Sequence, residues 1–384
     1  MKKINSLLIA TLFALAGCGD SKPPTEDLIT VDVTANYPKK ELVLQDFMDV
    51  EYIPLETTDE FVCQGIVRAV SNNLLIITNK KNDGDIFIYD RNGKALRIIN
   101  RRGQGGEEYN SISSITLDEN RNELFVCDSY SHTILIYDLE GNFKRRLATD
   151  KNKIFYNVYD FDQEHLIVHD SFNENTTADL YTGQSFMLIS KQEGYITKEI
   201  QIPFKEKKSV VTRFTDESGM TYVFQPNTFY PIVPYLDDYV LLEASADTLY
   251  KYSSLSTMKP FIVRTPSIQS MNPEGFLFPL MLTERYCFLA IFIKGSGYQD
   301  VMYDKYENTC FQYQVYNKDY TKNEEVSFKS KPLNREIPSC QSLDASKLVN
   351  DYQKGWLKGR LKEIASTMKE DDNPVIMLIK YKQK

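Results

Sequence analysis

The feature that most constrains the fold of this chain is a repeated strand–turn–strand pattern. Residues 86–97 read IFIYDRNGKALR, and residues 134–145, which begin 48 positions later, read ILIYDLEGNFKR. In each copy an apolar run is followed by Asp-x-x-Gly and then by a second strand-like run. Glycine supplies the positive φ of a tight turn, and aspartate can accept hydrogen bonds from the turn backbone. Each copy is therefore predicted to be the outer hairpin of a small antiparallel sheet.

The repeat extends beyond these two hairpins. An apolar run precedes each of them, at 74–77 and 124–126, and weaker copies follow at 186–189, 247–252 and 301–305. Four-stranded units that recur every 40–50 residues are typical of propeller blades. At about 50–60 residues per blade, the chain has room for six or seven blades. We predict an all-β fold, a six-bladed β-propeller with four-stranded antiparallel blades. The alternative is a β-sandwich or a β-solenoid, which fits this hairpin repeat poorly.

One amphipathic helix is expected near the C-terminus, within residues 343–370. Its apolar residues recur at helical spacing with Lys and Glu between them, so it should pack on the last blade. Binding of a partner is the alternative role. Pro374 should end this region, and residues 375–379 read as a buried strand. The early strand at 29–33 is expected to join that last blade and close the ring. The helical positions are Leu348, Tyr352, Trp356, Leu361, Ile364 and Met368.

The first residues predict export and lipid anchoring. Lys2 and Lys3 precede an apolar run at 7–15, which is too short to span a bilayer because a spanning helix needs about 20 apolar residues. The following Leu-Ala-Gly-Cys sequence ends at Cys18 and matches the bacterial lipobox. We therefore predict a signal peptide at 1–17 and a lipid anchor on Cys18. An ordinary signal peptide with a chance cysteine is the alternative.

These features divide the chain and predict its location. Residues 18–27 are polar and contain two prolines, so they should form a flexible tether. Residues 28–384 are then the propeller domain. A lipid on Cys18 would attach the protein to a membrane of the cell envelope of a Gram-negative bacterium. We expect the outer membrane, with the periplasmic or surface face left open.

Charge and cysteine content narrow the possible partners. The chain has 53 acidic and 45 basic residues, which disfavours a nucleic-acid partner because such proteins carry basic patches. Apart from Cys18, five cysteines remain, and an odd number cannot all pair within one chain. Cys127 and Cys287 lie in apolar runs and should be buried. No Cys-x-x-Cys pair supports a zinc or thioredoxin-like site. The other three cysteines are Cys63, Cys310 and Cys340.

Four segments together resemble a known family, the six-bladed β-propeller lipoproteins, which are similar in style to NHL-repeat propellers. Residues 50–57 resemble the family's entry motif, 101–109 its Gly-rich loop, 247–250 its central Asp-Thr-Ile-Tyr strand and 372–375 its C-terminal end. They occur in the family's order and span nearly all of the chain after the tether. The loop departs from the family pattern at Gly106, where Pro is usual, and at the next residue, where Gly is usual. The resemblance implies a fold and lipoprotein character, and it implies no activity.

The Gly-rich loop at 101–109 is the candidate ligand-binding segment. Its glycines would allow a partner to approach the backbone closely, and its side chains would bring charges and an aromatic ring to one loop. It could line the mouth of the central channel. The alternative, which we favour, is a connector between blades with Arg101 and Glu108 as an ion pair. It is not a phosphate-binding loop, because it lacks Gly-Lys-Ser/Thr and a following helix. The candidate ligand-binding residues are Arg101, Arg102, Gln104, Glu107, Glu108 and Tyr109.

Other features give no metal, cofactor or catalytic site. His165 and His169 would lie on one strand about 13 Å apart, too far for one metal ion. The remaining histidine is His132, so a histidine-rich zinc centre lacks ligands, although calcium held by carboxylates and carbonyls stays open. No Gly-x-Ser-x-Gly nucleophile motif occurs. The aromatic and proline-rich segment 222–235 could stack on sugars or a peptide, but a packed loop between blades is the favoured interpretation.

We therefore expect a cell-envelope lipoprotein whose propeller is a binding module without enzymatic activity. Its ligand would be a glycan, a peptide or a protein. One alternative is an envelope hydrolase or lyase with its site in the central channel, since propellers host such chemistry. Another is a structural subunit of an envelope complex.

Overall fold

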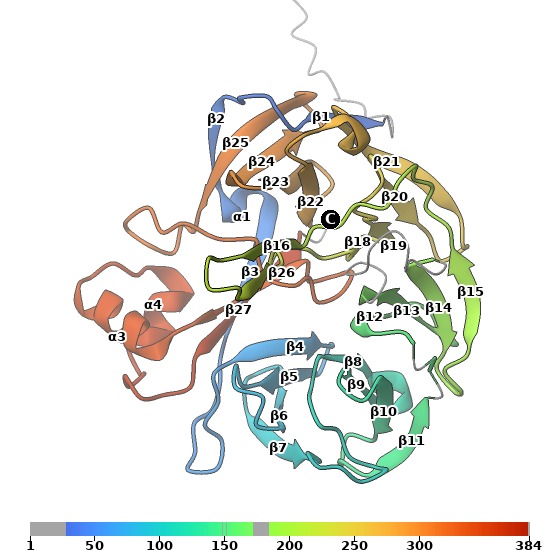
Figure 1. Ribbon diagram of the computed structural model, residues 1–384. Coiled ribbons are helices and arrows are strands. Elements are labelled where there is room, and N and C mark those ends of the chain that lie inside the picture. Colours follow the sequence, from blue (N-terminus) through green and yellow to red (C-terminus); the bar gives the residue numbers. More distant parts are fainter. Residues whose placement is uncertain (1–27, 148, 151, 172–183, 383–384) are drawn as a thin grey trace, which may run out of the picture.

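The computed structural model describes residues 28–147, 149–150, 152–171 and 184–382, and Cys18 with the predicted tether lies outside them. These residues form a ring of six β-sheets around a central axis, so the predicted six-bladed propeller is confirmed (Figure 1). Blade 1 contains β4 (Ile66–Val70), β5 (Leu74–Thr78), β6 (Asp85–Asp90) and β7 (Ala95–Asn100). Blade 2 contains β8 (Ser114–Asp118), β9 (Glu123–Asp128), β10 (Thr133–Tyr137) and β11 (Phe143–Leu147). Blade 3 contains β12 (Phe155–Asp160), β13 (His165–Asp170), β14 (Phe186–Ser190) and β15 (Ile196–Ile200).

The remaining three blades vary this plan. Blade 4 contains β18 (Ile232–Tyr235), β19 (Asp238–Leu241), β20 (Thr248–Tyr252) and β21 (Met258–Thr265). Blade 5 contains β22 (Gly275–Leu282), β23 (Tyr286–Ile293), β24 (Gly297–Asp304) and β25 (Thr309–Tyr316). Blade 6 has three strands, β26 (Ser339–Leu343), β27 (Val375–Tyr381) and β3 (Met48–Pro54). The strands nearest the axis are β4, β8, β12, β18, β22 and β26.

The repeated hairpins form as the sequence predicts. In blade 1, Gly93 has a φ of +83°, and the Asp90 carboxylate accepts hydrogen bonds from the backbone N–H groups of residues 92 and 94. In blade 2, Gly141 has a φ of +86°, and Asp138 accepts from the N–H of residue 142 over 2.8 Å. Both hairpins also carry an irregularity in pairing just before the turn. The two hairpins are thus β6–β7 and β10–β11, the outer pairs of their blades.

Packing between blades explains why the strands are apolar on both faces. Along β9, Leu124 and Val126 join a buried cluster with blade 1, whereas Phe125 and Cys127 join a cluster with blade 3. Because successive side chains of a strand point to opposite faces, each central strand serves two interfaces. The core is therefore a set of layers between blades rather than one central cluster.

The predicted position of the first strand is wrong. β1 (Ile29–Asp32) does not join the last blade; it pairs in parallel with β21 of blade 4, with Ile29 opposite Ile262. Next in the chain, β2 (Lys39–Val43) pairs in parallel with β25 of blade 5. A short helix, α1 (Leu44–Phe47), then leads into β3, which completes blade 6. The chain start thus crosses the outer edges of two blades before it closes the ring.

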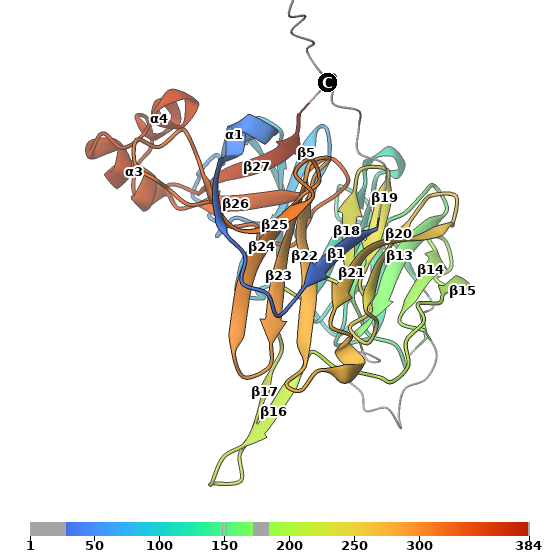
Figure 2. The ribbon, with the colours of Figure 1, turned by 90° about the horizontal axis from the view of Figure 1, so that it is seen from above.

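The structure also differs from the prediction of a single helix within 343–370, because this region forms two helices. α3 (Ala345–Gln353) and α4 (Gly359–Ala365) are separated at Gly355, whose φ of +71° ends the first helix. They lie outside the ring between β26 and β27, as Figure 2 shows. Leu348 and Leu361 belong to the same buried cluster as strands of blade 6, so packing on that blade is confirmed. No helix in the described ranges is long and apolar enough to cross a membrane.

Closure of the ring joins the two ends of the propeller. β3 pairs antiparallel with β27, and Tyr52 lies opposite Met377. Beside this pair, the buried amide of Asn373 accepts from the N–H of Cys63 over 2.8 Å. It also donates to the carbonyl groups of Glu56 and Phe61 over 2.9 and 2.7 Å. Two segments from the family resemblance, 50–57 and 372–375, therefore meet here.

Replacement of Asn373 by Ala should destabilise the protein by about 2–4 kcal/mol, because it leaves one buried N–H and two partly buried carbonyl groups without this partner. Urea unfolding at equilibrium would measure the change. The control Asn152→Ala alters an exposed side chain and should change the free energy of unfolding by less than about 0.5 kcal/mol. Equal stability of the two variants would contradict this account of ring closure.

Candidate functional site

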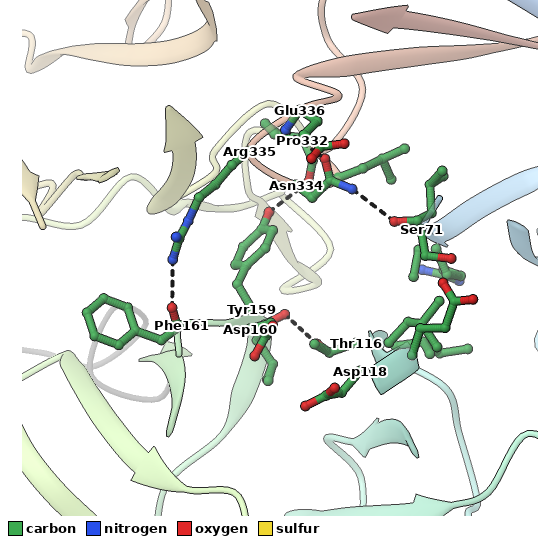
Figure 3. A pocket seen from close by; sticks show the side chains of 18 of the residues that line it. Ser71, Thr116, Asp118, Tyr159, Asp160, Phe161, Pro332, Asn334, Arg335 and Glu336 are labelled. Carbon is green, nitrogen blue, oxygen red and sulfur yellow. Dashed lines mark hydrogen bonds between the residues drawn. The ribbon is translucent and has the colours of Figure 1, made fainter. Parts of the chain in front are cut away.

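A cavity of about 380 Å³ opens where the inner strands of blades 1, 2 and 3 end near the axis (Figure 3). We call it the channel cavity. Its walls are residues 68–72, 115–120 and 158–161, together with Tyr239 of blade 4. Residues 331–336, which we call the channel loop, close its remaining side. This loop lies between β25 and β26, so four blades and the connection between the other two contribute to one site.

Hydrogen bonds to blades 1 and 3 and a cation–ring contact with blade 4 hold the channel loop in place. The Tyr159 hydroxyl donates to the carbonyl of Pro332 over 3.0 Å. Arg335 donates to the carbonyl of Phe161 over 2.7 Å, and its guanidinium lies 4.8 Å from the centre of the Tyr239 ring. From the other end, Asn334 donates to the carbonyl of residue 70 over 2.9 Å. Figure 3 shows Tyr159, Asn334 and Arg335 converging on the cavity. The loop is thus a fixed wall of the site.

One side of the cavity contains a buried ion cluster. Lys191 follows β14, is 1% exposed, and its ammonium lies 2.6 Å from Asp118 and 2.5 Å from Asp160. Asp118 is nearly buried, whereas Asp160 is about half exposed to the cavity. A buried ammonium requires such partners, because desolvation of an unpaired charge is costly. The two carboxylates are therefore engaged in holding blades 2 and 3 together at the cavity wall.

Arg68 and Lys331 bring two positive charges to the cavity without a carboxylate partner among the described residues. Arg68 Nε donates to Thr78 Oγ1 over 2.7 Å, and Lys331 Nζ lies 5.0 Å from the centre of the Tyr159 ring. Burial, followed by the neighbouring Arg68 charge, lowers the pKa of Lys331 to about 8. Burial also lowers the pKa of Arg68. The cavity therefore combines unpaired cations with aromatic walls.

The six loop residues proposed from the sequence do not line the channel cavity. They lie between β7 and β8, where Arg101 Nε donates to the carbonyl of Gly141 over 2.9 Å. The expected Arg101–Glu108 ion pair is absent, because the Glu108 carboxylate instead accepts from the N–H of Gly105 over 2.8 Å. Arg101, Arg102, Gln104 and Glu107 are exposed. Their binding of a ligand stays a prediction.

Tyr109 shows how this loop connects the first two blades. Its ring is fully buried between blades 1 and 2, and its hydroxyl donates to the carbonyl of Gly84 over 2.6 Å. The backbone of the loop receives further hydrogen bonds from blade 2: the Tyr137 hydroxyl donates to the Glu107 carbonyl, and Arg146 donates to the Gly106 carbonyl. These contacts support the interpretation of 101–109 as a connector between blades.

The other candidates from the sequence are dispersed. His165 contacts Asp162 over 2.9 Å, whereas His169 is buried and burial lowers its pKa to about 3. Within the described ranges, no group of three His, Cys, Asp or Glu side chains is arranged to hold a metal ion. The five cysteines after Cys18 are free and buried, including the expected Cys127 and Cys287.

The aromatic segment 222–235 has two different environments. Residues 221–224 form β17, which pairs with β16 (Thr212–Thr215) in a hairpin that projects from the ring in Figure 2. Tyr222 and Phe224 are exposed there, and Tyr222 stacks on Phe214 at 4.9 Å. Residues 232–235 are the buried inner strand of blade 4. The interpretation of the whole segment as a packed loop is therefore wrong.

Sequence reasoning missed the residues that meet in the channel cavity. The clearest available signal is Arg68, a lone charge inside the apolar run at 66–70. Lys331 and Lys191 lie in polar surroundings of the sequence and carry no motif. Their positions depend on how the channel loop and the blades pack together in the closed ring.

Replacement of Lys331 by Met should raise the free energy of unfolding at pH 7 by about 1–3 kcal/mol, because it removes a charge that the folded state disfavours. The folded-state pKa of about 8 lies below the ordinary value of 10.5. The penalty is therefore complete below pH 8, and the advantage of the variant should shrink as pH rises toward 10.5. Urea titrations at pH 7 and pH 9.5 would show it.

The control for this variant is Lys329→Met, which removes a more exposed ammonium that pairs with Asp300 at 2.8 Å. It should change the stability by less than about 0.5 kcal/mol at either pH. Loss of stability in Lys331→Met at pH 7 would show that Lys331 is not a destabilising charge.

One solved structure with a similar fold agrees with this architecture. A crystal structure of a protein from Bacteroides fragilis NCTC 9343, whose name suggests export, is similar with a TM-score of 0.59 and 16% sequence identity. The similarity covers 93% of this chain and 100% of that one. A member of the DUF4221 family from Bacteroides vulgatus ATCC 8482 matches with a TM-score of 0.46 and 12% identity, over 88% of this chain and 98% of that one.

Comparison of the amino-acid sequence itself identifies the family. A search of curated proteins finds no match. Residues 28–380, which include every blade, match the family model described as "Domain of unknown function (DUF4934)". The match covers far more than half of the chain. The protein is therefore a member of the DUF4934 family.

Proposed function

We propose that this protein is a lipid-anchored module of the bacterial cell envelope that binds a small polar ligand in the channel cavity. The supporting observation is the cavity of about 380 Å³ with aromatic, cationic and amide groups converging on it from separate blades. Ligand sites of small molecules have volumes of about 300–1,000 Å³ and combine apolar walls with a few placed polar groups.

The geometry favours binding over catalysis. The Asp118 and Asp160 carboxylates both contact Lys191, so they neutralise a buried charge. The Tyr159 hydroxyl donates to the backbone of the channel loop. These groups shape and brace the walls, and a preformed rigid wall lowers the entropic cost of binding. A glycan or a short peptide fits these walls, since both offer hydroxyl or amide groups and flat surfaces for Tyr159 and Tyr239.

Location in the envelope is supported by the sequence before the propeller. The apolar run at 7–15 and the lipobox that ends at Cys18 are typical of bacterial lipoproteins. The resemblance to lipoprotein propellers and the similar fold of the Bacteroides fragilis protein agree with this location. The lipid would attach the protein to the outer membrane, and residues 18–27 would hold the propeller away from it.

Fractionation of cells that produce the wild type or Cys18→Ala would test the anchor. The wild type should sediment with membranes and incorporate labelled palmitate, whereas Cys18→Ala should be soluble in the periplasm or medium, because a lipid anchor supplies the membrane affinity. The control Cys63→Ser alters a cysteine of the propeller and should still be labelled. Membrane association of Cys18→Ala would contradict the proposed anchor.

Affinity selection would test the ligand site. Full-length Cys18→Ala protein would be incubated with soluble oligosaccharides and peptides from Gram-negative envelopes, and retained compounds identified by mass spectrometry. Glu336→Trp should reduce retention at least about tenfold, since it places a large ring at an exposed position of the cavity rim. Glu370→Trp, also exposed but near the helices, should retain the wild-type amount.

The outcomes separate the candidate functions. Equal retention by both Trp variants would mean that the ligand binds elsewhere on the protein. Compounds that are recovered cleaved would favour an envelope hydrolase or lyase instead. A stoichiometric protein recovered from solubilised membranes by the wild type and by Glu336→Trp would favour a structural subunit.

A further inference from the structure

The channel cavity adjoins a second, smaller cavity of about 200 Å³, with which it shares three lining residues. We call it the inner cavity. Its lining includes residues 65–68, Ser114, Ser330 and Cys340. Arg68, Ile115 and Lys331 line both cavities, so these three residues stand where one passes into the other. Any ligand group that enters deeply from the channel cavity meets the two cations at this point.

The charge of this junction is unusual for the chain. The whole protein has a net charge of −8, and the other buried cation of the site, Lys191, is matched by two carboxylates. Arg68 and Lys331 instead make hydrogen bonds or ring contacts to neutral groups, and burial together with the Arg68 charge lowers the pKa of Lys331. Two like charges that share a partly buried site are costly unless an anion joins them. A bound anion would relieve this cost.

A third polar group points to the same position. Ser114 begins β8, lines the inner cavity and is 2% exposed. Within the part of the chain that the structure describes, no group makes a geometrically well-formed hydrogen bond to its hydroxyl oxygen; the nearby thiol of Cys127 is a weak partner for it. Buried hydroxyl groups nearly always have a partner, so a group of this kind beside a cavity indicates a ligand atom. Arg68 reaches toward the same region, because its guanidinium also donates to the carbonyl of Ser113.

We propose that Arg68, Lys331 and Ser114 form an oxyanion-binding subsite at the junction of the channel cavity and the inner cavity, which holds an acidic group of the ligand. The inference rests on the proposed function and specifies its ligand as one that bears a carboxylate, sulfate or phosphate. The guanidinium and ammonium groups donate charged hydrogen bonds to the oxyanion, and the hydroxyl donates a neutral one. The tyrosine walls and the channel loop contact the remainder of the ligand.

The pH dependence follows from the groups that face Lys331. These are Arg68 from β4, Cys127 from β9 and Tyr159 from β12. Burial raises the pKa of Cys127 to about 12 and raises that of Tyr159, so both are neutral at pH 7. Asp118 and Asp160 of the adjoining wall are held by Lys191. Lys331 is therefore the group that loses its charge near pH 8, and affinity for an oxyanion should fall above that pH.

NMR of the protein with ¹³C-methylated lysines would test the subsite directly. The Lys331 signal, assigned by its loss in Lys331→Gln, would be titrated in sodium chloride and in acetate, sulfate or phosphate at equal ionic strength. At least one oxyanion should raise the pKa of Lys331 by about one unit, which corresponds to about tenfold tighter binding of the charged form. The most effective probe identifies the acidic group. An unchanged pKa with all three would overturn the proposal.

Variants of Arg68 provide a second measurement. Arg68→Gln should weaken binding of the effective probe at least about tenfold, whereas Arg68→Lys should keep part of it because the charge remains. Arg360→Gln removes an exposed cation of α4 and should leave binding unchanged. Retention of probe affinity in folded Arg68→Gln would count against the subsite, and circular dichroism would establish folding.

The result is separable from the proposed function. If envelope compounds are retained in the channel cavity but no oxyanion changes the pKa of Lys331, the proposal of an oxyanion subsite is wrong and the proposed ligand-binding function is supported. If an oxyanion binds at Lys331 but no envelope compound is retained, the subsite stands and the proposed function is wrong.

Discussion

The structure depends on the pairing of β3 with β27, which closes the ring. Each blade is apolar on both faces, so each face must be covered by a neighbouring blade. An open ring would expose one face of blade 6 and one of blade 1, and this cost makes closure a condition for the stability of the whole. Asn373 joins residues on either side of the closure and bonds to Thr57, which is 316 residues away along the chain. Long-range pairing of this kind makes the blades one cooperative unit.

Closure of the ring also determines which residues gather near the central axis. The inner strands approach one another around the axis, and the channel loop crosses from blade 5 toward blades 1, 3 and 4. Asn334 and Arg335 of the loop donate to backbone carbonyls at the ends of inner strands, and the Tyr159 hydroxyl donates to the loop carbonyl of Pro332. A protein with a net negative charge thus presents unpaired positive charges at its centre. These charges lower the free energy of unfolding, and perturbed charges of this kind are typical of binding sites.

Local chemistry was predictable where a short stretch of sequence sufficed. The Asp-x-x-Gly hairpins fold as expected, because turn conformation depends on residues within four positions of each other. The first and last segments of the family resemblance also found a physical explanation, since they meet at the ring closure. Predictions failed where a segment had two possible neighbours. The strand at 29–32 fits the edge of any blade, and its pairing with β21 followed from the path of the chain. Gly355 divided the expected helix, because its positive φ outweighed the apolar spacing around it.

The sequence by itself determined the repeat, the apolar strands, the hairpin turns and the lipobox. These depend on contacts between neighbours in the chain, so pattern and composition are sufficient to identify them. Only the tertiary structure decided which charged residues share a cavity. Arg68 and Lys331 are 263 positions apart in the numbering, and no pattern in the sequence around either residue predicts that the two lie close together. They meet because the closed ring places the inner strand β4 and the channel loop at the same cavity, and a circular arrangement is a property of the whole chain.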